Sequence, residues 1–273
     1  KMMKTLKNHT LIYDKDCPMC AVYSSAFIGS GMLDKNGREA FCEISLEDKN
    51  LLDYNRSRNE IALINHQENK VIYGLDSLLL IIGNSFPLLV KIAKIQPLYW
   101  FFQKLYKLVS FNRKQIIPSV KDTEKDACVP DFNLKYRLLY IGFVAVFSAF
   151  VLSEFSPKLW QNLTPNFYRE LSVCLAQIFW QTLFLKSFLK DNFWNYLGNM
   201  MTVSLLGTLL LIPVLFLNFN ELFFGVYFFL VVSVMFLEHF RRCKILKLGF
   251  LPTFSWLIFR LTLALLIFAI YSK

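Results

Sequence analysis

The chain has 273 residues, of which 55% are hydrophobic, and its mean hydropathy of +0.40 is high for a soluble protein. Its net charge of +10 is distributed unevenly: residues 1–133 hold 18 basic and 15 acidic side chains, and the more apolar residues 134–273 hold 12 and 5. Basic loops between apolar stretches are typical of membrane proteins, so this excess excludes a nucleic-acid footprint and favours acidic lipid head groups as the partner.

The cysteine content and the first residues of the chain indicate the cellular compartment of the N-terminal domain. The six cysteines in 273 residues are too sparse for a disulfide-stapled scaffold. The basic segment Lys1–Thr10 is not followed by a long apolar core, so it does not resemble a secretory signal peptide. We therefore expect the N-terminal domain to stay in the cytoplasm.

The first third of the chain has the pattern of an α/β domain. The predicted elements are a strand at Thr10–Tyr13, a helix at Cys17–Phe27, a strand at Ala40–Ile44, a hairpin of Ile61–Ile64 and Lys70–Tyr73, and a helix at Leu75–Ile82. Asp16 or the turn before it is expected to cap the first helix, with Pro18 in its first turn. This order of elements is that of thioredoxin.

A second helical region is predicted at Phe86–Phe111, broken at Pro97. It mixes aromatic residues with lysines, so it either lies on a membrane surface or packs on the α/β domain. Prolines and mixed charges then predict a linker. The expected organisation is a thioredoxin-like domain at 1–111, a linker at 112–133 and an all-α transmembrane bundle at 134–273.

About five transmembrane spans are predicted in the last part, since each apolar stretch approaches the roughly 20 residues that cross a bilayer. They lie near 136–155, 168–187, 194–217, 221–240 and 251–271. The second span is interrupted by polar residues, so whether it crosses fully is left open. The basic residues that flank the spans are Lys135, Arg137, Lys186, Lys190, Arg241, Arg242, Lys244 and Lys247. They place the N-terminal domain inside and, with five spans, the C-terminus outside.

The segment Cys17-Pro18-Met19-Cys20 is the motif with specific chemistry. At a helix start, unpaired backbone N–H groups and the helix dipole lower the pKa of the first thiol, which makes Cys17 the predicted nucleophile and Cys20 the resolving thiol. Lys15 would lower that pKa further, whereas Asp14 and Asp16 would oppose it. The alternatives are half of a zinc site, which needs two further ligands, and two unconnected core thiols.

The wider string from Leu11 to Cys20 resembles the DCC family of thiol-disulfide oxidoreductases, whose signature is Y-D-G-x-C-x-x-C. The resemblance continues through Val71–Gly74, Leu98–Arg113 and Ala127–Pro130, and includes none of the spans. It implies a redox role for Cys17 and Cys20, and makes Asp14 part of the motif. Two features differ: Lys15 replaces the signature glycine, and Arg58–Ile61 lacks the proline that faces the cysteine pair in thioredoxin.

Outside the motif, Cys128 and Cys243 are candidate secondary thiols, the latter in an inside loop. Glu238 and His239 are expected to form an interfacial salt-bridge cluster with the neighbouring arginines, and Arg260 in the last span is a candidate functional charge. Small and polar residues such as Gly198 and Thr202 predict tight helix packing in the third span.

The sequence thus predicts a membrane-anchored thiol-disulfide oxidoreductase of an inner bacterial membrane. It acts on a protein or small-molecule thiol or disulfide and requires no cofactor beyond its own cysteines. Two alternatives remain: a transporter or assembly factor whose bundle does the work while the redox domain senses or docks, and a quinone-linked membrane reductase.

Overall fold

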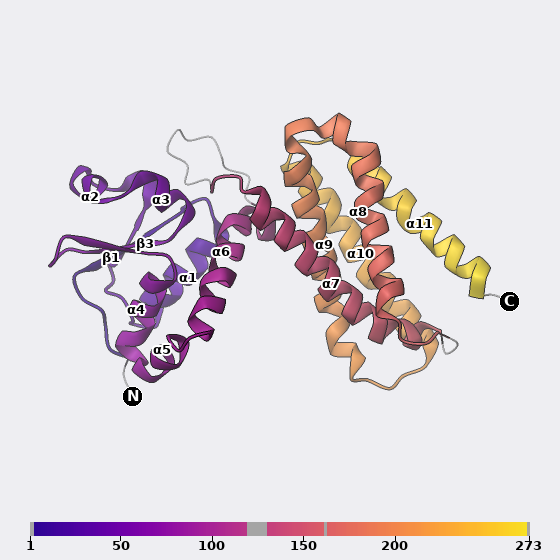
Figure 1. Cartoon of the computed structure of the whole chain (residues 1–273), viewed down its shortest axis with the longest axis horizontal. Helices are drawn as coiled ribbons and strands as arrows, with labels where there is room; N and C mark the ends of the chain where they lie inside the picture. Colours follow the sequence, from indigo (N-terminus) through magenta and orange to yellow (C-terminus); the bar gives the residue numbers. More distant parts are fainter. Residues whose placement is uncertain (1–2, 119–129, 161–162, 272–273) are drawn as a thin grey trace. The chain divides into compact units, whose positions relative to one another are not determined.

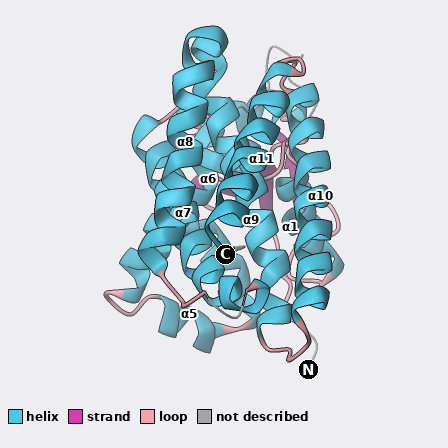
Figure 2. Cartoon of the chain, turned by 90° about the vertical axis from the view of Figure 1, so that its right-hand side faces the viewer, coloured by secondary structure: helices cyan, strands magenta, loops and turns pink. Residues whose placement is uncertain are grey.

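The computed structural model describes residues 3–118, 130–160 and 163–271. It divides into two compact units, Lys1–Tyr136 and Arg137–Lys273 (Figure 1). The strands all lie in the first unit, and helices dominate the rest of the described chain (Figure 2). The predicted fold class, a thioredoxin-like α/β domain followed by a helical region with long apolar helices, is confirmed.

The first unit is built on a four-stranded sheet in the order β2-β1-β3-β4. The strands are β1 (His9–Tyr13), β2 (Arg38–Ala40), β3 (Ala62–Asn65) and β4 (Lys70–Tyr73). β1 pairs with β2 in parallel, and with β3 antiparallel, while β3 and β4 form the predicted hairpin. β1 therefore lies in the middle of the sheet, and its C-terminal end leads directly into the cysteine motif.

Both faces of the sheet are covered, because successive side chains of a strand point to opposite sides. Apolar residues at neighbouring positions of the two central strands accordingly belong to two separate core clusters. One cluster contains Leu11, Leu33, Leu63 and Ile81, and the other contains Ile12, Phe41, Ala62 and Ile64. This two-sided burial explains why β1 and β3 are continuous apolar runs rather than alternating ones.

Helices connect and cover the strands. They are α1 (Pro18–Gly29), the 3-10 turn η1 (Phe41–Glu43), α2 (Leu46–Leu51), α3 (Tyr54–Asn59), α4 (Leu75–Ser85), α5 (Pro87–Ala93) and α6 (Leu98–Ile116). The predicted strand Ala40–Ile44 was wrong beyond its first residue. β2 ends at Ala40, and the turn that follows directs the Phe41 ring into the core and against Tyr54.

The helical region before the predicted linker breaks at Pro97, as expected, into α5 and α6. α6 packs on the domain through polar residues of its last turns, whereas Trp100 and Phe101 of its first turns are more than half exposed. It continues to Ile116, which is five residues into the segment predicted as the linker 112–133. Its last turns are thus part of the folded domain.

The membrane region consists of long apolar helices. They are α7 (Leu134–Leu159), α8 (Phe167–Leu189), the short turn η2 (Lys190–Asn192), α9 (Phe193–Leu215), α10 (Glu221–Ile245) and α11 (Leu251–Tyr271). Three segments of the described chain are long and apolar enough to cross a membrane: Leu134–Leu159, Phe167–Leu215 and Glu221–Ile245. The second of them contains both α8 and α9, and the Leu251–Ile267 part of α11 is a shorter apolar helix. Five helices lie where five spans were predicted, and the number of crossings stays a prediction.

Large apolar side chains cover the outside of this unit, as expected for helices in lipid. They include Phe143, Phe150, Phe179, Phe229 and Leu265, each at least half exposed. These observations indicate a membrane-embedded protein.

Polar residues lie inside the second unit instead. Gly198 and Thr202 are buried, and the Thr202 hydroxyl bonds to that of Tyr140 at 2.8 Å. Glu238 forms ion pairs with Arg241 and Arg242, as predicted.

His239 does not belong to the predicted cluster. It is 1% exposed and lies between the hydroxyls of Tyr196 and Thr253, at 3.3 and 3.1 Å from its ring nitrogens. The reason is helical geometry: the residue that follows Glu238 is turned by about 100° around the helix axis, toward the interior of the bundle.

Candidate active site

The two cysteines of the motif lie at the start of α1, where the sequence placed them. Cys17 is the N-cap residue, with extended backbone angles (φ −95°, ψ 108°), and Pro18 occupies the first helical position. The Cys17 amide donates to the Asp14 carbonyl at 3.2 Å. Cys17 rather than Asp16 therefore begins the helix, which corrects the predicted cap. Cys17 and Cys20 are 2% and 4% exposed, so both sulfurs are screened from solvent.

The environments of the two thiols push their pKa values apart. A hydrogen bond from the Cys20 thiol is the main reason why the pKa of Cys17 falls from 9.0 to about 7, with a further contribution from the charge of Arg113. The same hydrogen bond and burial raise the pKa of Cys20. Near neutral pH, Cys17 is thus the thiol that ionises while Cys20 keeps its proton, as thiol exchange requires.

This difference predicts the pH dependence of alkylation. In reduced full-length protein, the rate at which iodoacetamide modifies Cys17 should be half-maximal near pH 7, because only the thiolate reacts and its pKa is about 7. We expect the rate to be slow, since Cys17 is 2% exposed. Mass spectrometry of the Cys17 peptide measures it, and a midpoint at the ordinary thiol value near 9 would contradict the arrangement.

A buried ion pair lies beside the cysteines. The Arg113 guanidinium of α6 donates to an Asp14 carboxylate oxygen at 3.3 Å and to the Arg58 backbone carbonyl at 3.1 Å. The side chains of Arg113 and Asp14 are 6% and 5% exposed. Burial raises the pKa of Asp14, while the positive charge of Arg113 opposes that shift. Asp14 also accepts from the Asp16 amide at 3.1 Å, which shapes the turn before Cys17.

Arg113, rather than Lys15, is the positive charge beside Cys17. Lys15 forms an ion pair with Glu43, and both side chains are more than half exposed. The cation that lowers the pKa of Cys17 is Arg113, which lies 99 residues from Asp14 in the chain. The only sequence signal was the resemblance that extends to Arg113, because a basic residue in the last turn of a helix is otherwise explained by the helix dipole.

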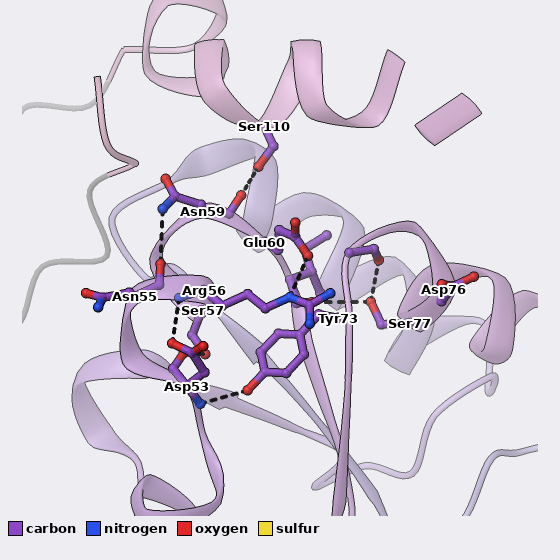
Figure 3. Close-up of polar contacts among 12 residues, drawn as sticks. Asp53, Asn55, Arg56, Ser57, Asn59, Glu60, Tyr73, Asp76, Ser77 and Ser110 are labelled. Atoms are coloured by element: carbon purple, nitrogen blue, oxygen red, sulfur yellow. Dashed lines mark hydrogen bonds and ion pairs between the residues drawn. The ribbon is translucent and has the colours of Figure 1, made fainter. Parts of the chain in front are cut away.

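The connection into β3, residues 58–61, consists of the last two residues of α3 and the two residues that follow, and it is held from α6. The Ser110 hydroxyl donates to the Asn59 carbonyl, as Figure 3 shows, and the Ile61 amide donates to the Tyr106 hydroxyl at 2.8 Å. Together with the bond from Arg113 to Arg58, three side chains of one helix satisfy three backbone groups of this connection. In thioredoxin a proline occupies this connection, and here α6 fixes its course instead.

A small pocket opens between this connection and the cysteine helix. Its polar wall is formed by Asp14, Cys20, Tyr23, Glu60 and Arg113. The Tyr23 hydroxyl is buried, and Cys20 is its polar neighbour in the pocket. Burial, and secondarily Cys20, raises the pKa of Tyr23, so the hydroxyl keeps its proton and can donate it to a neighbouring sulfur or to a bound molecule.

The remaining cysteines lie elsewhere. Cys128 is outside the described residues. Cys243 belongs to the last turns of α10 rather than to the predicted loop, and is 2% exposed, with its sulfur 3.6 Å from His239 Nδ1. Cys42 is half-buried in η1, and Cys174 is half-buried in α8. Within the part of the chain that the structure describes, no three His, Cys, Asp or Glu side chains form a group that could hold a metal.

A thioredoxin-like sheet with a Cys-x-x-Cys pair at the start of its first helix defines the class of thiol-disulfide oxidoreductases. The comparison with protein families gives the same class: residues 11–118 match the model of the DCC1-like thiol-disulfide oxidoreductase family, and this part of the chain is a domain of that family. The matched segment contains the sheet except for the first two residues of β1, and it ends just after α6, so it includes Arg113. No curated protein and no solved structure matches the chain.

Proposed function

We propose that the protein is a membrane-anchored thiol-disulfide oxidoreductase that exchanges disulfides through Cys17 and Cys20. The observation that carries the proposal is the position of Cys17 and Cys20 at the start of α1, beside the buried Arg113–Asp14 pair. This position agrees with a lowered pKa of Cys17 and a raised pKa of Cys20. The family match of residues 11–118 supports a redox role.

The proposed reaction has two steps. The Cys17 thiolate attacks one sulfur of a substrate disulfide, which forms a mixed disulfide and releases the other substrate sulfur as a thiolate. Cys20 then loses its proton and attacks the Cys17 sulfur, which releases the second substrate thiol and leaves a Cys17–Cys20 disulfide. Two electrons pass from the protein to the substrate, and no further cofactor is needed. Asp14 holds Arg113 beside the pair, where its charge favours the thiolate.

For localisation, we propose an inner bacterial membrane with the redox domain in the cytoplasm and, with five crossings, the C-terminus outside. Two of the flanking arginines on which the predicted orientation depends form hydrogen bonds inside the bundle. Arg137 donates to the Trp194 carbonyl at 2.7 Å, and Arg242 donates to Asn199 at 2.9 Å. The orientation therefore rests on the other flanking lysines and on Arg241. In a reducing cytoplasm the resting form is the dithiol.

A redox titration of the full chain tests the proposal. In detergent, with Cys42, Cys128, Cys174 and Cys243 replaced by serine, the protein is equilibrated in graded thiol/disulfide buffers and its thiols are counted by maleimide gel shift. We expect one reversible step of two thiols, absent in Cys17→Ser and Cys20→Ser, and its midpoint gives the reduction potential. No step, or one that only a metal chelator removes, would contradict the assignment.

A second candidate, a bundle with a function of its own, is favoured by buried polar groups of α8 and α11 that have no partner among the described residues. Under that alternative the redox domain senses or docks, and Cys17→Ser is tolerated. A quinone-linked reductase belongs to the same alternative, because it also requires a ligand among the helices.

A further inference from the structure

The second unit contains a cavity that the thiol chemistry does not use. It lies among α7, α8, α9, α10 and α11, and holds about 630 Å³ of space outside protein atoms, including the part that opens to the surroundings. Most of its wall is apolar, formed by residues such as Leu152, Met201, Leu211, Phe228, Val231 and Phe259.

Two polar side chains in this wall lack partners. Gln177 of α8 is 4% exposed, and neither atom of its amide makes a hydrogen bond among the described residues. Arg260 of α11 forms no ion pair with any described residue, and its Nε is buried without a hydrogen-bond partner. Its guanidinium lies over the Trp256 ring, 4.9 Å from the centroid. In a membrane such groups are costly, because no water is present to satisfy them.

The side of the cavity that carries these groups is fixed by packing between α8 and α11. The Trp180 indole nitrogen donates to the Ser255 hydroxyl at 3.1 Å, and the Trp180 and Phe259 rings lie 6.0 Å apart. On the other side, the Thr208 hydroxyl already bonds to Ser148 at 2.8 Å. The unmet hydrogen-bonding capacity of the wall is thus concentrated on Gln177 and Arg260.

The chemistry of these groups specifies the ligand. A guanidinium has donors and no acceptor, and the amide of Gln177 adds two donors and one acceptor, so donors predominate. The matching group is an oxygen acceptor, either a carbonyl or a carboxylate, and the apolar wall requires that the rest of the molecule be hydrocarbon. We propose that this cavity binds a lipophilic molecule with an oxygen-bearing head, of the quinone or fatty-acid type, whose head is held by Arg260 and Gln177.

The chain provides a matched control. Gln181 lies one turn after Gln177 on α8, is 0% exposed and also has an amide without partners among the described residues, but it does not line the cavity. Gln177→Leu and Gln181→Leu therefore each remove a side-chain amide from α8. Only Gln177→Leu removes an amide from the proposed site.

The test is calorimetric titration of the full chain in detergent with decylubiquinone, oleate or hexadecane. We expect saturable binding of decylubiquinone or oleate, weakened at least about tenfold by Gln177→Leu and by Arg260→Met, and changed less than about twofold by Gln181→Leu. Whichever probe saturates identifies the quinone or the fatty acid as the source of the head group. Elution as a single species checks that each variant is folded.

Three outcomes would overturn the proposal: no saturable binding of either oxygen-bearing probe, equal binding of hexadecane, or an equal loss in Gln181→Leu. The test does not involve Cys17 or Cys20, so its result is independent of the redox titration.

Discussion

Replacing Cys17 with serine is expected to abolish disulfide exchange, with a loss of at least about 100-fold in rate, because no thiolate remains to attack the substrate. Replacing Cys20 should have a different result. The first step can still occur in Cys20→Ser, but the mixed disulfide cannot be resolved, so the substrate stays covalently bound to Cys17 until an external thiol releases it. Reduction of a small aromatic disulfide, followed by absorbance, measures the first effect, and a non-reducing gel shows the second.

Cys42→Ser is the control for both variants. Cys42 lies in η1, directly after β2, and is partly exposed, so it is an accessible thiol of the same domain. We expect its replacement to leave the exchange rate unchanged within about twofold, because η1 is a single turn of three residues and lacks the long helix dipole that favours a thiolate at the start of α1. Full activity in Cys17→Ser, or its loss in Cys42→Ser, would show that the exchange does not proceed through the motif.

Removing Arg113 is expected to destabilise the redox domain strongly. Arg113→Met leaves the Asp14 carboxylate buried without its ion-pair partner, and loss of one member of a buried pair typically costs about 3–5 kcal/mol. Hydrogen exchange of the β1 and α1 amides in the full chain measures this local stability, and their protection should fall. The pKa of Cys17 should rise at the same time, since Arg113 is the charge that lowers it, and the alkylation profile moves to higher pH.

The loss of stability in Arg113→Met is expected to depend on pH. Without Arg113, the pKa of Asp14 in the folded protein rises further above its ordinary value of 3.8. A carboxyl whose folded pKa is raised binds protons more tightly in the folded state, so folding is penalised progressively as pH increases from 3.8 through the folded pKa. The difference in protection between Arg113→Met and the parent protein should therefore be smaller at acidic pH than at neutral pH.

Two further variants test the origin of the effect. Asp14→Asn combined with Arg113→Met removes both charges, and we expect it to recover part of the lost protection without restoring the low pKa of Cys17. Lys15→Met removes a cation near the motif that pairs with Glu43 at the surface, and such a pair contributes about 0–1 kcal/mol. Equal effects of Lys15→Met and Arg113→Met would show that the buried pair has no special role.

Much of this protein follows from local sequence signals. Alternating and continuous apolar runs predict the strands and the hairpin, the position of Cys17 and Pro18 predicts the start of α1, and long apolar stretches predict the membrane helices. These features depend on residues within a few positions of one another, so a single sequence contains the necessary information.

The tertiary structure decided the remaining features, because these depend on contacts between residues that are distant in the sequence. The sequence did not show that Arg113 joins Asp14 across 99 residues, or that three side chains of α6 hold the connection into β3. It did not distinguish Gln177, which faces a cavity, from Gln181, which does not. Nor did it place His239 inside the bundle, where helical rotation separates it from Glu238. Charge and polarity are visible in a sequence, but the partner of each group is determined only when the chain is folded.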